Sequence, residues 1–491
     1  MGDALTNNPL SSYAIYSATI IRLQRRPMER SVAVAVLLVL ALSTIAPEHQ
    51  VARAAPTNTS FTFSFGGDTG YYGDDLTGAV ASHKLISADF FIDLGDISYN
   101  GTSRNNLPTG NEGAWCNFVK QYVHNRLGQP SYPYEIVAGN HEDGTDPQKD
   151  GYIDAFVACL PNQFSNFVES GLCNGTTTCY GKEGYFDYPT GQPMARFILI
   201  SNALRIGSAT SNETYDYCPL DVCQKPRFDQ HYQWLKQSID SAKTLGYWVI
   251  VVQHKPCLSP DIATFCEGMG IYNNNNPGAQ LLSLEISEHV DLILTGHAHV
   301  YARSKQLSCY GSLQPNDGTL PVYESSCVVN DGSSGTYERG RGPVQIIQGD
   351  FSQRDGQLNF TRPDIDYFAT AMSARGTVAR SVPAVCCLVN GQPIDENSGN
   401  GIGIITVTPQ QLSFTREMSV QSHLVTGGST FGDSFVIRAK AMGSDFWLAV
   451  ITYGIIAAVI ISVAYGGLQI RKRNLAKQAK THVISSGNLA Q

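Results

Sequence analysis

The chain has 491 residues, of which 42% are apolar and 15% charged, and its formal net charge at pH 7 is −8. This low charged fraction, with no basic patch outside the flanks of the apolar segments near the two ends, argues against a nucleic-acid-binding protein. The length alone would suggest about three domains. The motifs described below instead place a single domain over residues 55–440, with inserts.

Residues 1–54 are predicted to be an N-terminal extension that ends in a signal peptide. A basic stretch precedes an apolar run over residues 32–46, which is too short to span a membrane comfortably. A small-x-small cleavage pattern follows at residues 52–54, as is typical of secretory signals. Met28 would begin a more ordinary signal peptide than Met1 does, so both starts stay open.

Five short apolar runs follow, and each is rich in β-branched or aromatic residues, which indicates buried strands. The runs cover residues 61–65, 90–94, 135–138, 248–252 and 290–294. Each run leads into a polar cluster: Gly67-Asp68-Thr69-Gly70, Gly95-Asp96-Ile97-Ser98-Tyr99, Gly139-Asn140-His141-Glu142, His254, and Gly296-His297-Ala298-His299. Helix-like stretches at 75–87 and 229–242 lie between them, an alternation typical of an α/β fold. Strand carboxyl ends line the ligand crevice in such sheets, so we expect the clusters to converge.

The clusters contain the donors of a metal site. Carboxylate, amide, phenol and imidazole groups suit hard or borderline divalent and trivalent metals, and the absence of a thiolate argues against a closed structural zinc site. Each cluster has an ordinary alternative. Taken alone, Asp68 or Asn140 would more often be a turn residue. Tyr99 alone would more often be a packing residue, and His254 alone could be an interior histidine. All five clusters in order favour the metal site.

This order of motifs, D-x-G, G-D-x-x-Y, G-N-H-[DE], V-x-x-H and G-H-x-H, resembles that of the purple acid phosphatases, which belong to the calcineurin-like metallophosphoesterase superfamily. The resemblance covers about residues 61–437, and residues 296–304 (GHAHVYARS) are most similar to the plant-type members. It implies an α/β fold, a metallophosphoesterase β-sandwich of two mixed sheets flanked by helices.

The resemblance also implies the metals and their ligands. Iron(III) would be bound by Asp68, Asp96, Tyr99 and His299. A second, divalent metal (zinc, iron or manganese) would be bound by Asn140, His254 and His297. Asp96 would bridge the two ions, at the separation of roughly 3.5–4 Å that two-metal chemistry needs. The Tyr99 phenolate would keep iron trivalent, and His141 would stabilise charge on the substrate or relay a proton.

The implied function is that of an acid phosphatase, which hydrolyses small phosphomonoesters by attack of a metal-bound hydroxide. A phosphodiesterase or nucleotide pyrophosphatase using the same metals is one alternative, and a non-catalytic surface binding module is another. Members of the family usually carry one or two more histidines about nine or ten residues after the V-x-x-H histidine, but residues 255–267 contain none. The proton for the leaving group would then come from His141, Glu267 or a metal-bound water, so we expect aryl phosphates or phosphoanhydrides to be favoured over alkyl phosphates.

Cysteines and glycosylation sequons indicate an oxidising compartment. Twelve cysteines lie between Cys116 and Cys387, with no C-x-x-C spacing, which favours disulfides. Close sets are Cys173 and Cys179, Cys218 and Cys223, Cys257 and Cys266, and Cys309 and Cys327. The pairing stays open, although adjacent Cys386 and Cys387 cannot easily bond each other, so that one or both would pair elsewhere. N-glycosylation is predicted at Asn58, Asn100, Asn174, Asn212 and Asn359.

Several segments are predicted to be inserts or connections. Residues 159–225 are expected to form a disulfide-stapled surface excursion, and residues 273–277 and 308–341 loops near the site. The alternating runs 402–407 and 411–416 predict a hairpin, and residues 435–442 a short stalk.

The uncharged run over residues 446–470 is long enough to span a bilayer, and Arg471-Lys472-Arg473 follows it. Basic residues favour the cytoplasmic side, so the sequence predicts one C-terminal transmembrane helix with a cytoplasmic tail over 471–491. The chain would be a single-pass type I membrane protein whose catalytic domain is extracellular or in the endosome or lysosome lumen. An uncleaved N-terminal segment would add a second span. Plasma membrane versus endolysosome and the oligomeric state stay open.

Overall fold

The computed structural model describes residues 60–69, 88–97, 112–120, 131–142, 153–160, 163–173, 178–206, 213–266, 268, 275–314, 320–351, 356–373, 377–378, 387–390, 392–394, 401–418, 431–440 and 444–486. By its internal contacts the chain divides into two units, and the described residues from 60 to 440 all belong to one of them. The described part of the other unit is a single helix.

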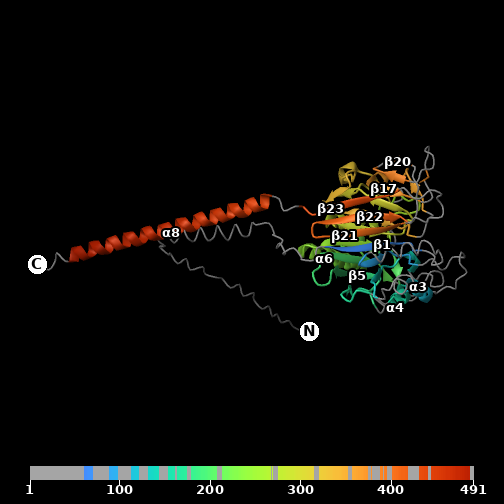
Figure 1. Ribbon diagram of the computed structural model, residues 1–491, viewed down its shortest axis with the longest axis horizontal. Helices are drawn as coiled ribbons and strands as arrows, with labels where there is room; N and C mark the ends of the chain where they lie inside the picture. The colour runs from blue at the N-terminus through green and yellow to red at the C-terminus, as the bar shows by residue number, and fades with distance from the viewer. Residues whose placement is uncertain are drawn as a thin grey trace, which may run out of the picture. The chain divides into compact units, whose positions relative to one another are not determined.

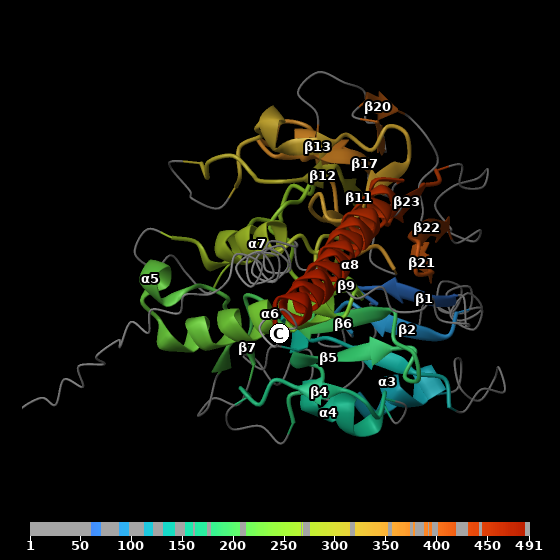
Figure 2. The ribbon, with the colours of Figure 1, turned by 90° about the vertical axis from the view of Figure 1, so that its left-hand side faces the viewer.

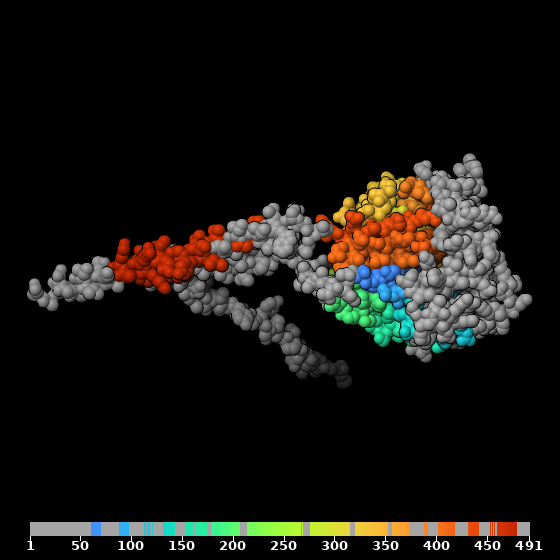
Figure 3. Space-filling view, in the orientation of Figure 1, coloured from blue at the N-terminus to red at the C-terminus, as the bar shows by residue number. Residues whose placement is uncertain are grey.

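The first of two large sheets has seven strands (Figure 1). Their order is β14 (Thr336–Glu338), β23 (Ser434–Arg438), β22 (Gln411–Met418), β21 (Gly401–Val407), β1 (Phe61–Gly66), β2 (Phe90–Asp93) and β3 (Tyr134–Ile136). Strands β1, β2 and β3 are parallel, and β21 is antiparallel to β1. The residues of β1 and of β21 to β23 also lie side by side on the surface in the space-filling view, as neighbouring blue and orange areas (Figure 3).

The second sheet has ten strands. Their order is β20 (Gln392–Ile394), β19 (Cys387–Val389), β17 (Phe368–Met372), β11 (Tyr301–Ser304), β15 (Val344–Gln348), β10 (Leu292–Thr295), β9 (Trp248–Gln253), β6 (Ala195–Ile200), β5 (Glu183–Tyr188) and β4 (Val168–Glu169). Its centre, β15-β10-β9-β6, is parallel. Both sheets are therefore mixed, and each contains a set of neighbouring parallel strands whose ends can meet.

Short elements complete this unit. The helices are α3 (Glu112–Val119), α4 (Ile153–Cys159), α5 (Leu220–Cys223), α6 (Pro226–Thr244) and α7 (Pro277–Ser287), with 3₁₀ turns at Asn140–Glu142, Ser325–Cys327 and Ile365–Tyr367. The two-stranded pairs are β7 (Arg205–Ile206) with β8 (Glu213–Thr214), β12 (Gln306–Leu307) with β13 (Val328–Asn330), and β16 (Leu358–Asn359) with β18 (Thr377–Val378).

The core lies between the two sheets and is strongly aromatic. The ring of Phe63 stacks on Phe90 at 5.4 Å between centroids and meets Phe197 of the other sheet edge-on at 4.9 Å. Alternate residues of each strand face outward, where helices cover the ten-stranded sheet. Leu235 and Ile239 of α6 share a buried cluster with residues of β9, and Figure 2 shows α6 and α7 on one side of this sheet and β1 and β2 on the other. The two-sheet sandwich flanked by helices is the predicted fold.

The predicted strands after which the polar clusters come are all present, as β1, β2, β3, β9 and β10. The predicted hairpin is present as β21 and β22, and the second predicted helix lies within α6. Three assignments were wrong. Residues 308–341 are not a loop throughout, because they contain β13 and β14, and β14 belongs to the seven-stranded sheet. Residues 159–225 are not a surface excursion, because they contain β5 and the fully buried β6. Residues 435–442 are not a stalk, because β23 pairs with β22 and β14.

Five disulfides join described cysteines. Cys173–Cys179, Cys218–Cys223, Cys257–Cys266 and Cys309–Cys327 pair the close sets, and Cys116–Cys159 joins α3 to α4. Cys387 is disulfide-bonded as well. Cys386, helix 75–87 and most of the sequons lie outside the described residues.

Residues 446–470 form the first part of α8 (Ser444–Ser486), so that a helix is present where one was predicted. Its bounds run beyond the apolar run, through the basic cluster at 471–473 and into a polar stretch. In the part of the chain with described structure, no helix meets the length and apolarity that a membrane crossing requires. The transmembrane assignment is therefore not supported.

Candidate metal centre

The structure brings together every predicted metal ligand that lies within its described residues. From the seven-stranded sheet come Asp68 after β1, Asp96 after β2 and Asn140 after β3. From the ten-stranded sheet come His254 after β9, and His297 and His299 after β10. Tyr99 lies outside the described residues. The six side chains thus reach one place from the carboxyl ends of strands in both sheets.

These side chains form two groups of donors. Asp96, His254 and His297 are one group, and Asp68, Asp96 and His299 are the other; within each group the donor atoms lie within 4.8 Å of one another. Asp96 belongs to both. One carboxylate shared by two sets of ligands is the arrangement that a pair of bridged cations requires.

The backbone at these positions is in an unusual conformation. Asp68, Asp96 and His297 have φ values of 59°, 51° and 67°, in the left-handed region that few non-glycine residues adopt. Such residues concentrate at functional sites, where surrounding contacts hold them. Here the Asp68 N–H donates to the Gly95 carbonyl at 2.9 Å, and the His297 N–H donates to Asp68 Oδ2 at 2.8 Å.

Glycine is required where two of these loops touch. A Cβ on Gly139 would lie 2.1 Å from the backbone nitrogen and Oδ1 of Asp96, and one on Gly95 would lie 2.7 Å from Nδ1 of His254. Gly95 also has a φ of 94°. The two glycines therefore allow Asp96, Asn140 and His254 to come close enough to share an ion.

Glu142 connects the second and third loops, a role that motif order alone did not predict. Its Oε1 accepts from Ile97 N at 2.9 Å and its Oε2 from Gly139 N at 2.9 Å, and the side chain is fully buried. Burial and the nearby Asp96 carboxylate raise the pKa of Glu142 well above its usual range. Its position as the last residue of G-N-H-E was the available signal.

The orientation of His254 fits a metal ligand. Nδ1 lies 2.8 Å from the Leu94 carbonyl, so we assign the proton to Nδ1, which leaves the Nε2 lone pair for a cation. Nε2 faces two oxygens, Asn140 Oδ1 at 3.1 Å and Asp96 Oδ1 at 3.2 Å. Donor atoms that converge in this way repel one another unless a positive charge lies between them. The residues present therefore fit a metal.

The second group shows the same convergence. His299 Nε2 lies 3.1 Å from Asp68 Oδ1, and the Asp68 side chain is fully buried.

Burial alone would raise the pKa of Asp96, but the imidazoles of His254 and His141 outweigh burial and hold the pKa of Asp96 well below its usual range. Burial alone would lower the pKa of His254, but the Asp96 carboxylate outweighs it and raises that pKa. The site thus strongly favours positive charge next to Asp96.

His141 lies at the edge of the site. Its N–H donates to Asp96 Oδ1 at 2.9 Å, and its Nε2 is 3.8 Å from Asp96 Oδ2. The side chain is 24% exposed, unlike the fully buried His254. An imidazole that borders both the shared carboxylate and solvent can reach a bound substrate.

A buried carboxyl behind the site was not predicted. Asp93 accepts from Thr69 Oγ1 at 2.8 Å and from the Tyr134 hydroxyl at 2.9 Å. Burial raises its pKa to about 7 in spite of these hydrogen bonds. Thr69 is the neighbour of Asp68, so the hydrogen bond to Asp93 helps to hold the loop that carries Asp68.

The region after His254, where the family histidines are missing, is a loop closed by the Cys257–Cys266 disulfide. Glu267, a predicted source of the leaving-group proton, lies outside the described residues.

Comparison with known proteins agrees with this geometry. Residues 67–301 match the model of the calcineurin-like phosphoesterase family. Purple acid phosphatase 18 of Arabidopsis thaliana is 24% identical over 309 residues, which is 62% of this chain and 52% of the relative. Purple acid phosphatase 22 of the same plant is 22% identical over 317 residues, 63% of this chain and 55% of the relative. The chain thus spans about half the length of these relatives.

A solved structure, purple acid phosphatase PPD1 from yellow lupin (Lupinus luteus) seeds, aligns with a TM-score of 0.46 and 14% identity over 79% of this chain and 56% of that chain. The sequence motifs and the match over residues 67–301 both point to similarity with metallophosphoesterases. Over part of its length, this chain is similar to the calcineurin-like phosphoesterases and to the purple acid phosphatases.

Proposed function

We propose that this chain is an acid phosphatase with two metal ions, which hydrolyses small phosphomonoesters. The observation that carries the proposal is the sharing of Asp96 by two groups of donors. Two cations bound there would activate a water molecule and hold a phosphate oxygen. Asp68 and His299, with Tyr99, would bind iron(III), while Asn140, His254 and His297 would bind zinc, iron or manganese.

The protein side chains have separate roles in this reaction. Asp96 would be a ligand shared by the two cations, and Glu142 holds the loops that carry Asp96 and Asn140. His141 is the described side chain best placed to stabilise charge on the substrate phosphate or to relay a proton. Water adds to phosphorus, the bond from phosphorus to the ester oxygen breaks, and the products are phosphate and an alcohol.

The compartment is proposed to be extracellular or lumenal. Five disulfides among the described residues support an oxidising environment. Of the five predicted glycosylation sites, Asn359 lies within the described residues, and its Oδ1 accepts from the N–H and hydroxyl of Thr361, the third residue of its sequon. A glycan at Asn359 remains a proposal.

The test is hydrolysis of an aryl phosphate at acidic pH by the full-length chain, loaded with iron and zinc, beside its Asp96→Asn variant. We expect activity in the parent and a loss of about a hundredfold or more in the variant, because the amide cannot bridge two cations as a carboxylate does. A metal-loaded parent without activity would favour the second candidate, a non-catalytic binding module, which the missing histidines after His254 support.

Bound metals would also colour the protein purple or pink if Tyr99 binds iron(III).

A further inference from the structure

The loop between Cys257 and Cys266 packs with the chain segment that carries His299. Cys257, Leu258 and Cys266 share a buried apolar cluster with Ala298 and Val300, the two neighbours of His299. The loop also begins three residues after His254 in the chain, so it is linked to one predicted ligand by sequence and to another by packing.

A second set of contacts links the loop to His299. The Ile262 N–H donates to the Gln357 carbonyl, and the Gln357 N–H donates to Asp261 Oδ1, both at 2.9 Å. Gly356, the residue before Gln357, is so close to His299 that a Cβ on it would lie 2.5 Å from the His299 carbonyl oxygen. The loop and the segment at 356–357 therefore form one wall beside the metal centre.

The interior of this loop is held firmly. Arg362 is 5% exposed, and its Nη1 donates to the carbonyls of Asp261 at 2.7 Å and Thr264 at 2.6 Å. Asp261 Oδ2 accepts from Ala263 N at 3.0 Å and from Thr264 Oγ1 at 3.1 Å. With the disulfide, these bonds fix the backbone of the loop before any ligand binds.

Yet the loop presents two large apolar side chains to solvent, Ile262 at 40% and Phe265 at 37% exposure. Among the described residues between 60 and 440, large apolar side chains this exposed are Val168, Leu220, Leu245, Ile262 and Phe265. Two of them thus lie on one short, rigid loop beside the metal centre. Exposed apolar groups that gather next to a polar site are typical of a ligand-binding surface.

We propose that Ile262 and Phe265 bind the apolar part of the substrate's leaving group, so that the site takes aryl phosphomonoesters in preference to small alkyl ones. This inference rests on the proposed phosphatase function, in which the metal centre binds the phosphate. A substrate whose phosphate lies at the metals and whose ring covers this wall would remove both side chains from water.

Non-hydrolysable phosphonates test the binding step separately from leaving-group chemistry. Phenylphosphonate and methylphosphonate share one anionic group and differ in the apolar group attached to phosphorus. The experiment measures their inhibition constants against hydrolysis of an aryl phosphate by the metal-loaded, full-length chain. The variants are Ile262→Ala, Phe265→Ala and the double variant. Leu245→Ala is the matched control, because Leu245 is 47% exposed and lies just before β9, at the opposite end of that strand from His254.

The parent and Leu245→Ala are expected to bind phenylphosphonate about five- to tenfold more tightly than methylphosphonate. The double variant should lose most of this preference through weaker binding of phenylphosphonate alone, with an unchanged melting temperature. An active parent without the preference, or a double variant that keeps it, would overturn the role of the loop and leave the phosphatase function standing. A parent without phosphatase activity would overturn the proposed function, and this inference with it.

Discussion

At the scale of single residues, the buried side chain of Glu135 in β3 makes the stability of the protein depend on pH. It is fully buried, its Oε1 accepts from Phe164 N at 2.9 Å and its Oε2 from the Tyr180 hydroxyl at 2.6 Å. Burial outweighs these hydrogen bonds and raises its pKa from 4.5 to about 7. Between these two values the folded chain holds a proton that the unfolded chain releases, so the free energy of unfolding falls as the pH rises.

We therefore predict that Glu135→Gln reduces the loss of stability between about pH 4.5 and pH 7, because the amide cannot ionise. The pH-dependent contribution of Glu135 to the free energy of unfolding is roughly 3 kcal/mol. It is fully present below about pH 4.5 and is lost above about pH 7. Denaturant unfolding at a series of pH values measures it. Glu338→Gln, at a side chain that is 44% exposed, serves as the control and should keep the parent profile. A variant at Glu135 with the parent profile would contradict the assignment.

Which site residues could be predicted depended on how locally they are encoded. Asp68, Asp96, Asn140 and His254 each lie within four residues of the end of a strand, so a short motif identified them. Asp93 and Glu142 act through neighbours that are distant in sequence: Asp93 binds Tyr134, and Glu142 binds Ile97. Only the fold shows that these partners meet.

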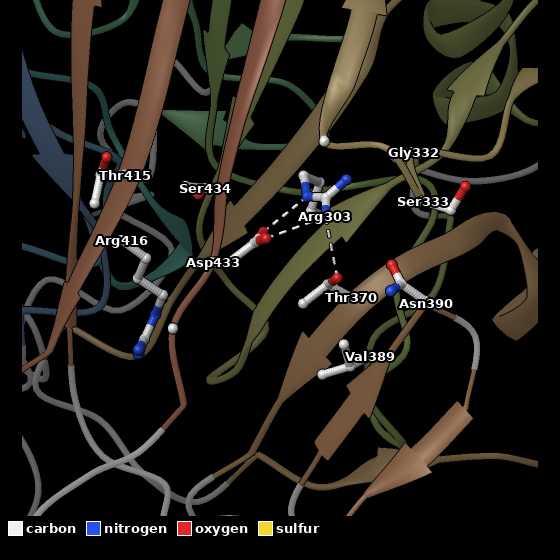
Figure 4. Close-up of a pocket in the computed structure, with 12 residues that line it drawn as sticks. Arg303, Gly332, Ser333, Thr370, Val389, Asn390, Thr415, Arg416, Asp433 and Ser434 are labelled. Carbon is white, nitrogen blue, oxygen red and sulfur yellow. Dashed lines mark hydrogen bonds and ion pairs between the residues drawn. The ribbon is translucent and has the colours of Figure 1, made fainter.

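At the scale of elements, a buried ion pair joins the two sheets. Arg303 of β11 donates to Asp433, just before β23, through Nε at 2.7 Å and Nη2 at 3.1 Å, and Nη2 also donates to Thr370 Oγ1 at 3.1 Å. The pair lines a cavity of about 420 Å³, and Figure 4 shows the guanidinium and the carboxylate facing each other across the two sheets. Both side chains are less than a tenth exposed, at 3% and 7%.

We predict that Asp433→Asn destabilises the protein by about 3–5 kcal/mol, because it leaves the Arg303 charge buried without its counter-charge. Urea unfolding of the parent and the variant measures the difference. The matched control is Glu338→Gln, which breaks the pair of Glu338 with Arg341, whose side chains are 44% and 54% exposed. That change should cost less than about 1 kcal/mol. Equal effects at the two sites would mean that the Asp433 carboxylate is not the main partner of Arg303.

The elements that sequence patterns missed are those defined by long-range pairing. The run ARFILI of β6 is as apolar as the predicted strands, but no polar motif follows it, and the cysteines on either side suggested a surface loop. The short strand β23 becomes recognisable only through its partners, since Val436 pairs with Ser413 on one side and with Thr336 on the other. Similarly, Cys116–Cys159 joins residues 43 positions apart.

At the scale of the whole molecule, the candidate metal centre is built from residues of both sheets of the sandwich. Asp68, Asp96 and Asn140 come from the seven-stranded sheet, whereas the three histidines come from the ten-stranded sheet. Asp68 and Asp96 are both fully or almost fully buried, and bringing these carboxylates and the neighbouring donors together without cations is unfavourable. Bound metal should therefore stabilise the packing of one sheet on the other as well as the chemistry of the site.

We predict that removal of metal with a chelator lowers the melting temperature of the entire sandwich in one cooperative transition. An ion present at a hundred times its dissociation constant contributes about 2.7 kcal/mol, which corresponds to a shift of several degrees. Scanning calorimetry of the full-length chain with iron and zinc, after chelation and after metal is restored, measures the effect. The Asp96→Asn variant should show little change on chelation, because its shared ligand is lost. A parent that melts at the same temperature with and without metal would show that the two sheets pack without help from the site, and that the six converging side chains contribute to function alone.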